Sequence, residues 1–260
     1  MIERLLTFPF SVQVGFVFIF GLLVGSFCNV CIYRIPKGKS VVFPGSHCTN
    51  CNSPVRSWDN IPVLSYIFLG AKCRTCKTPI SIIYPLIELI TALLITAAYI
   101  SFGPTWEFCI YFIVLPALVV ITAIDFEHKI IPDLITLPGI IFGFIAGYFL
   151  VGIWDSLFGF LLGGGLFFFL AVVSKGGMGG GDIKFIAAAG ALFGWQKVLL
   201  IIFAGAFLGS IIGGMLMIAK LSTRKSQIPF GPFLAIGTCI AIFSGDDIIQ
   251  LYISAMNGNF

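Results

Sequence analysis

Eight apolar runs constrain this chain more than any other feature of its sequence. A membrane-spanning helix needs about 20 mostly apolar residues, and six of the runs come close to that length or exceed it. Only 10% of the 260 residues are charged, whereas soluble domains average roughly 25%. We therefore expect an all-α integral membrane protein with about eight spans. The predicted spans are 8–30, 82–100, 108–124, 134–151, 154–173, 183–193, 198–219 and 232–243.

The positions of the basic residues predict how the chain crosses the membrane. With the N-terminus outside, the inner segments are 31–81, 125–133, 174–184 and 220–231. All of the 15 lysines and arginines except Arg4 and Lys197 then lie inside. Cytoplasmic loops carry such an excess of basic residues, so the cytoplasmic membrane with this orientation is the predicted location. The net charge of +4 is explained by these loops, and no nucleic-acid partner is expected.

The longest polar segment, 33–81, carries two Cys-x-x-Cys pairs. Four thiolates from two such turns can converge on a tetrahedral Zn²⁺ with no open position, which is typical of a structural site. A loop this small buries little apolar surface, so a metal would contribute directly to its folding. Two disulfides are the alternative, but cytosolic thiols are kept reduced and such short loops gain little from closure. The predicted zinc ligands are Cys48, Cys51, Cys73 and Cys76.

Two aspartates follow apolar runs where the predicted topology returns to the inner side. Asp125 follows the run 108–124, and Asp182 ends the glycine-rich stretch 176–181. Ionisable residues at such positions are costly and are functional candidates by default. Two neighbouring carboxyl groups can share a proton and activate a water, as aspartic proteases do. Ordinary loop acids near lipid headgroups are the alternative reading.

The ends of the predicted helices add expectations for the neighbouring charged residues. Asp182 would begin a helix, where unpaired amides favour negative charge, whereas Asp125 would end one. We therefore expect Asp125 to hold the shared proton more readily. Asp133 follows a proline at the start of a span and is predicted to be a helix N-cap. Lys184 either extends to the headgroups or acts on the charge of Asp182.

Together these motifs resemble the bacterial type IV prepilin peptidases, which are also called leader peptidase/N-methyltransferases. The resemblance covers nearly the whole chain. It rests on segments 25–36 and 84–88, the two cysteine pairs, the loop from Asp125 to Asp133, the Gly-x-Gly-Asp motif ending at Asp182, and the Pro-Phe-Gly-Pro segment 229–232. Gly-x-Gly-Asp alone would be much less specific.

The resemblance implies an activity and assigns roles to residues. Asp125 and Asp182 match the family's catalytic pair, which cleaves the leader of type IV prepilins or pseudopilins at the cytoplasmic membrane face. Many members then methylate the new N-terminus with S-adenosylmethionine, an activity linked to the amino-terminal portion. Glu88 matches the family's acid in the second span. A place in the methyl-donor site and a buried acid paired with a neighbouring helix both remain open for it.

The expected organisation has a first span (1–32), a cytoplasmic zinc-binding loop (33–81) and a membrane aspartic peptidase domain (106–260), with a methyltransferase-associated region at about 10–105. Three alternative classes remain. Presenilin-like intramembrane proteases share Gly-x-Gly-Asp, but their other motifs differ from those around Ile124 and in 229–232. An ion-coupled transporter with helices broken at glycines is the non-enzymatic reading. A membrane scaffold with a zinc ribbon is the third.

Overall fold

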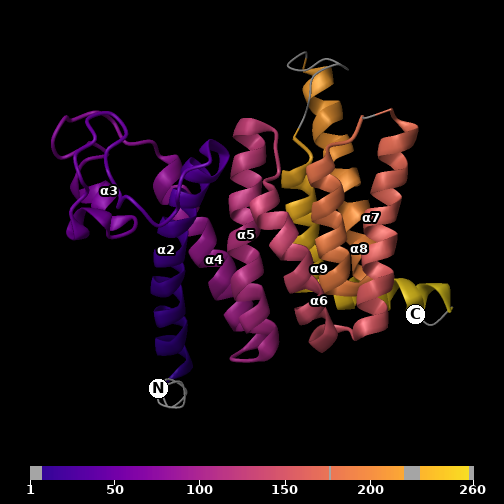
Figure 1. Cartoon of the computed structure of the whole chain (residues 1–260). Coiled ribbons are helices and arrows are strands. Elements are labelled where there is room, and N and C mark those ends of the chain that lie inside the picture. Colours follow the sequence, from indigo (N-terminus) through magenta and orange to yellow (C-terminus); the bar gives the residue numbers. More distant parts are fainter. Residues whose placement is uncertain (1–7, 176, 220–228, 258–260) are drawn as a thin grey trace. The chain divides into compact units, whose positions relative to one another are not determined.

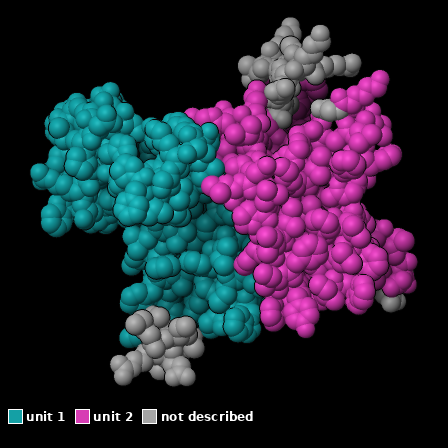
Figure 2. Space-filling view, viewed as in Figure 1, with its two compact units in different colours: residues 1–120 teal, residues 121–260 magenta. Residues whose placement is uncertain are grey.

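The computed structural model describes residues 8–175, 177–219 and 229–257. All the long elements in these ranges are α-helices, and the described residues form no β-strand. The chain divides into two compact units, Met1–Val120 and Ile121–Phe260, each with its own packing (Figure 2). Five residues used in the sequence predictions lie outside the described ranges: Arg4, Gly176, Lys220, Arg224 and Lys225.

Seven helices in the described residues are long and apolar enough to cross a membrane. This confirms the predicted all-α membrane fold, and the chain is a multi-pass membrane protein. Each predicted span lies within, or within two residues of, one of these helices. The helices are α2 (Phe10–Arg34), α4 (Ile83–Phe102), α5 (Trp106–His128), α6 (Asp133–Leu150), α7 (Ile153–Val173), α8 (Gly180–Ile218) and α9 (Gly231–Met256), shown in Figure 1.

Helix α8 contains the predicted sixth and seventh spans and is broken between them. Gly194 has φ 76° and ψ 179°, which is not helical. A Cβ placed on Gly163 of α7 would lie 2.8 Å from Cγ2 of Ile186 and 3.0 Å from Cγ2 of Val198. Residues twelve apart in a straight helix are about 18 Å apart, so the two halves must fold back on each other at Gly194. Counted separately, the two halves give eight long helical segments in the described residues, one for each predicted span.

Close contact between α2 and α4 organises the first unit. A Cβ on Gly21 would lie 2.7 Å from Cα of Ala92, and one on Gly25 would lie 2.6 Å from Cα of Glu88. Glycine therefore lets the two backbones approach, as is common between membrane helices. The loop joining these helices carries the short elements η1 (Ile35–Lys37), η2 (Ser57–Asn60) and α3 (Leu64–Phe68).

Glycines also set the packing of α6, α7 and the first half of α8 in the second unit. Gly159 of α7 faces Gly190 of α8, and a Cβ on Gly159 would lie 2.2 Å from the Gly190 carbonyl oxygen. On α6, a Cβ on Gly147 would lie 2.1 Å from the carbonyl oxygen of Ala191. Gly143 and Gly147 on α6, and Gly159 and Gly163 on α7, are each four residues apart and all face α8. Small residues at this spacing let membrane helices pack closely. Figure 1 shows these helices side by side.

Helix α9 is longer than predicted, because the expected span 232–243 continues to Met256. The predicted span stops just before Ser244, Gly245, Asp246 and Asp247. In the structure Asp246 bonds to Lys197 of α8, with 2.8 Å between Oδ2 and Nζ. The Asp246 side chain is 73% exposed, so this pair contributes only about 0–1 kcal/mol. The last turns of α9 project from the side of its bundle (Figure 1, yellow).

Candidate active site and metal centre

Asp125 lies in the last turn of α5 and is 5% exposed. The helix ends three residues later at His128. The amide of Lys129 donates to the Asp125 carbonyl oxygen at 2.8 Å, and Lys129 has the left-handed φ of 56°. A left-handed residue directly after a helix is a common way to end it, although glycine usually fills that position. The chain therefore turns immediately beyond Asp125, with the side chain buried.

The buried carboxylate of Asp125 is held by the start of α9. The backbone amide of Gly231, the first residue of α9, donates to Oδ2 of Asp125 at 2.8 Å. A Cβ on Gly231 would lie only 2.7 Å from the same oxygen. The first amides of a helix have no partner within the helix, and here one of them fixes the orientation of a carboxylate.

Asp182 occupies a corresponding position at the start of α8. Gly179 is the N-cap residue of that helix, and its backbone amide donates to the carboxylate of Asp182. An acidic side chain that reaches back from the third helical residue to the N-cap amide is half of a capping box. Asp182 is half-buried. Each aspartate is therefore oriented by the backbone amide of a glycine.

The two aspartates lie at the same end of the second unit and interact. Their carboxyl groups are close enough for their charges to act on each other. Ile131 packs between the two helix starts, since a Cβ on Gly181 would lie 2.8 Å from its Cβ and one on Gly231 would lie 3.2 Å from its Cδ1. Both carboxylates thus face a helix N-terminus. Asp125 ends α5 and Asp182 begins α8, as the sequence predicts, but the Gly231 amide also presents a helix start to Asp125. The assignment of the shared proton to Asp125 stays a prediction.

The prediction that Asp133 caps α6 is wrong. The N-cap residue is Pro132, and no side chain caps the helix. Asp133 is the first helical residue, and its Oδ1 lies 2.6 Å from Nζ of Lys184. Lys184 follows Asp182 by two residues but turns toward α6. Its ammonium group therefore ties α8 to α6, which is neither of the two roles expected from the sequence.

The four predicted metal ligands come together in the loop of the first unit. The Sγ atoms of Cys48, Cys51, Cys73 and Cys76 all lie within 4.8 Å of one another. Cys48 and Cys76 are 3.8 Å apart at their sulfur atoms. Four sulfurs at about 2.3 Å from a tetrahedral Zn²⁺ would be about 3.8 Å apart. The cluster therefore has the ligand number and the spacing for a metal ion.

The two cysteine pairs adopt matching turns around this cluster. The amide of Cys48 donates to the Ser53 carbonyl and that of Cys73 to the Thr78 carbonyl, both at 2.9 Å. The residue after each second cysteine has positive φ, 55° at Asn52 and 60° at Lys77. The Thr78 hydroxyl beside Cys76 lowers the pKa of that thiol to about 5. Such a thiol is readily deprotonated, as metal binding requires.

Two further cysteines lie in α2. Cys28 and Cys31 are buried, at 2% and 9% exposure. They belong to the packing of the helix. The loop is further fixed by Arg74, which lies next to Cys73 and makes two bonds to Asp59 at 2.6 and 2.7 Å. These bonds lower the pKa of Asp59.

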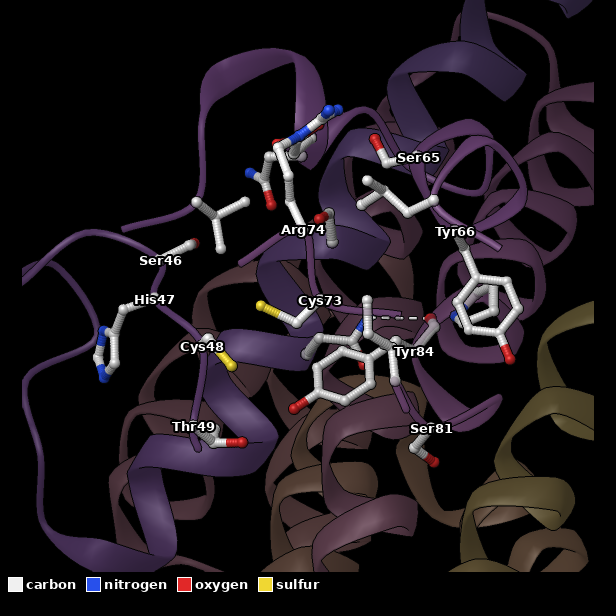
Figure 3. Close-up of a pocket in the computed structure, with 18 of the residues that line it drawn as sticks. Ser46, His47, Cys48, Thr49, Ser65, Tyr66, Cys73, Arg74, Ser81 and Tyr84 are labelled. Carbon is white, nitrogen blue, oxygen red and sulfur yellow. Dashed lines mark hydrogen bonds and ion pairs between the residues drawn. The ribbon is translucent and has the colours of Figure 1, made fainter. Parts of the chain in front are cut away.

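Glu88 lies beside a cavity of about 480 Å³ in the first unit. The cavity is bounded by the ends of α2 and α4 and by the cysteine loop. Figure 3 shows Cys48 and Cys73 on one side of it and Tyr66 and Ser81 on the other. Glu88 is 8% exposed and accepts bonds from the Val63 amide, at 2.8 Å, and from the side chain of Ser26. Its partners are therefore a loop amide and a side chain of α2.

Comparison with known proteins gives the family. The bacterial peptidase A24 N-terminal domain matches residues 19–102, and the type IV leader peptidase family matches residues 112–214. A Pseudomonas aeruginosa protein named prepilin leader peptidase/N-methyltransferase is 36% identical, with 90% of this chain and 91% of the relative aligned. The chain belongs to the type IV leader peptidase family. This confirms the resemblance drawn from the motifs.

Members of the leader peptidase family that resemble this chain come from several bacterial genera. Proteins with the same printed name match from Aeromonas hydrophila, at 34% identity over 92% of this chain and 93% of the relative, and from Bacillus subtilis, at 34% over 95% and 100%. No solved structure matches the chain. The N-terminal match contains Glu88 and the four cysteines, and the second match contains Asp125 and Asp182.

Sequence reasoning missed the backbone groups that hold these side chains. Gly231 was noted only as part of the motif 229–232, and nothing predicted that its amide would contact Asp125. Gly179 was noted only as part of the glycine-rich stretch 176–181. The amide of Val63 carried no sequence signal. The motifs in the sequence thus indicate the acids, but the backbone groups that donate to them become visible only in the fold.

Proposed function

We propose that this chain is a membrane aspartic endopeptidase that removes the leader of type IV prepilins or pseudopilins. The proposal is supported by its membership of the leader peptidase family and by the names of its relatives. The observation that carries it is the pair Asp125 and Asp182, whose charges interact at one end of the helix bundle. Two carboxyl groups in one site favour a single shared proton, which suits acid–base catalysis by the pair.

In the proposed mechanism the two aspartates act on a water molecule and the scissile carbonyl. The ionised aspartate accepts a proton from the water as the water attacks the carbonyl carbon. The protonated aspartate donates a hydrogen bond to the developing oxyanion. The amides of Gly231 and Gly179 hold the carboxyl groups in place throughout. Preorganised positions of this kind reduce the reorganisation that the reaction requires.

We place the active site at the cytoplasmic face of the bacterial inner membrane. Basic residues accumulate in the segments on the side of Asp125 and Asp182, in agreement with the positive-inside rule. The ends of α5 and α7 and the starts of α6, α8 and α9 lie at this side of the second unit. A leader that precedes a hydrophobic helix would be presented at the same depth.

We further propose that the chain methylates the new N-terminus with S-adenosylmethionine. Support comes from the match to the A24 N-terminal domain and from the name N-methyltransferase carried by relatives. Bound S-adenosylmethionine supplies an electrophilic methyl group. The cavity of about 480 Å³ in the first unit has the size of typical small-molecule sites, roughly 300–1,000 Å³. Glu88 and the cysteine loop border it.

For the cysteine cluster we propose a structural Zn²⁺. Four sulfur ligands leave no open position for a substrate or a water, as in other structural sites. The two matching turns would be joined by the ion, and the loop would gain the free energy of metal binding on folding. Cys48 and Cys73 also line the cavity. The ion would therefore help to shape the wall of that cavity.

One reaction tests both activities. Full-length protein in detergent or nanodiscs is incubated with a purified prepilin precursor, with and without S-adenosylmethionine, and products are followed by mass spectrometry. We expect release of the leader in both samples and methylation of the new N-terminus only with the methyl donor. Absence of cleavage by a folded, monodisperse sample would contradict the peptidase proposal, and cleavage without methylation would contradict the second one.

A further inference from the structure

The environment of Glu88 suggests a specific role in the first unit. Its side chain projects from α4 into the cavity bounded by α2 and the cysteine loop and is 8% exposed. Gly25 of α2 lies directly against its backbone, since a Cβ there would be 2.6 Å from Cα of Glu88. The carboxylate is therefore held at a fixed place between two packed helices, at the edge of a cavity large enough for a small molecule.

The loop donor to Glu88 is held in a strained conformation. Val63 has φ 63° and ψ −50°, and the Leu64 amide donates to the Pro62 carbonyl at 2.6 Å. This is a γ-turn of the rare, strained kind, and a β-branched residue makes it more unfavourable. The turn aims the Val63 amide at Oε2 of Glu88, 2.8 Å away. Strained backbone of this kind persists mainly at functional sites.

Two carboxylates line this cavity, and only one of them has a cationic partner among the described residues. Asp59 is bonded twice to the guanidinium group of Arg74. No lysine, arginine or histidine of the described chain forms an ion pair with Glu88. Its bonds come from neutral donors, the Val63 amide and Ser26. Arg34 also lines the cavity, but its guanidinium group donates to the carbonyl oxygens of Ser40 and Gly45. A buried carboxylate without a countercharge is costly, so Glu88 is left without a cationic partner among the described residues.

We infer that this cavity binds a positively charged group and that Glu88 is its countercharge. The inference deepens the proposed methyl transfer, on which it rests. That reaction has two cationic reactants, the sulfonium of the methyl donor and the α-ammonium of the newly cut N-terminus. Either cation would pair with the buried carboxylate of Glu88. The Val63 amide and Ser26 keep Glu88 oriented toward the cavity while the cation binds.

Binding measurements on the full-length, zinc-loaded protein distinguish the two cations. In one arm, calorimetry compares S-adenosylmethionine with S-adenosylhomocysteine, which lacks the charge on sulfur. In the other, a mature pilin peptide with a free N-terminus is compared with its N-acetylated form. We expect wild-type protein to bind the charged ligand more tightly than its uncharged counterpart in one of the two arms. Glu88→Gln should reduce that preference at least roughly tenfold, as expected for loss of a hydrogen bond to a charged group.

Matched variants separate charge from structure. Glu88→Asp keeps the charge and should retain part of the preference, whereas Glu107→Gln makes the same exchange outside the cavity and should retain all of it. Prepilin cleavage and zinc content are measured on every sample. If both remain while Glu88→Gln leaves the preferences in both arms unchanged, or if wild-type protein shows no preference in either arm, the inference is overturned. Failure of wild-type cleavage would instead remove the proposed peptidase function.

Discussion

The backbone amide of Gly231 donates a hydrogen bond to Oδ2 of Asp125 across 2.8 Å, joining the first residue of α9 to the last turn of α5. Asp182 has a similar partner in the amide of Gly179. In both cases the donor belongs to a helix N-terminus. Two separate helix starts thus orient the two carboxyl groups that we propose to be catalytic.

Gly231→Ala should impair cleavage while leaving the fold intact. The new Cβ would meet Oδ2 of Asp125 at 2.7 Å, and because that atom ends a side chain, the carboxylate can swing away without moving a helix. A displacement of about 1 Å at a reacting group can cost roughly 10²-fold in rate. Initial rates of prepilin cleavage and thermal unfolding measure the two effects.

The control for this variant is Gly165→Ala in α7, where a Cβ would have no atom within 4 Å. Cleavage by this control should match wild-type protein. If Gly231→Ala also cleaves at the wild-type rate, the amide of Gly231 does not position Asp125 in the way we describe.

The contact between Gly159 and Gly190 should dominate the stability of the second unit. A Cβ on either residue would lie within 2.2 Å of the other's carbonyl oxygen. Because the atom it meets belongs to the backbone and cannot rotate away, α7 and α8 would have to separate. Overpacking of this kind costs about 1–3 kcal/mol or more. We expect Gly159→Ala to lower the melting temperature clearly, whereas Gly165→Ala, on the same helix, should not. Equal melting temperatures for the two would contradict the described packing.

The cysteine cluster predicts about one Zn²⁺ per chain in protein purified without chelator. Cys76→Ser removes one of the four ligands and should lower the zinc content, because a three-ligand site holds the ion less tightly. Cys109 is exposed and lies outside the cluster, so Cys109→Ser should keep the wild-type content. Mass spectrometry of the metal measures both. Equal zinc in the two variants would show that the cluster is not the metal site.

The ion pair of Lys184 and Asp133 should contribute little to stability. Their side chains are 37% and 57% exposed, and pairs of this kind contribute about 0–1 kcal/mol. Lys184→Ala and Asp133→Asn should each have small effects, and the double variant should be no worse than the single ones. The pH dependence of cleavage should be unchanged in Lys184→Ala, since the ammonium bonds to Asp133. A shifted profile would indicate that Lys184 acts on Asp182 instead.

The sequence predicts the spans well because hydrophobic length is a local property. It locates Asp125, Asp182 and the four cysteines because their motifs are also local. It misses the extension of α9 beyond Phe243, since the pairing of Asp246 with Lys197 is a contact between two helices. It misses the amide of Gly231 for the same reason: that donor is distant in sequence from Asp125 and is brought to it only by the fold.

Helix ends show a second limit of the sequence. Asp133 has the residue type and position of an N-cap, yet the backbone of Pro132 occupies that place and Asp133 bonds to Lys184. Glu88 was recognised as an acid in an apolar helix. Its loop partner Val63 adopts a strained conformation that no local pattern of residues favours. Local preference is overridden here by contacts formed between distant segments.

The most direct test of this account is cleavage of a prepilin precursor by Asp125→Asn and by Asp182→Asn, with Asp133→Asn as the control acid. Asparagine keeps the size of each side chain and its bond from the glycine amide, but cannot take part in acid–base catalysis. We predict that both variants are expressed and folded yet release no leader, while the control cleaves like wild-type protein. Leader release by either of the first two variants would remove that aspartate from the catalytic pair.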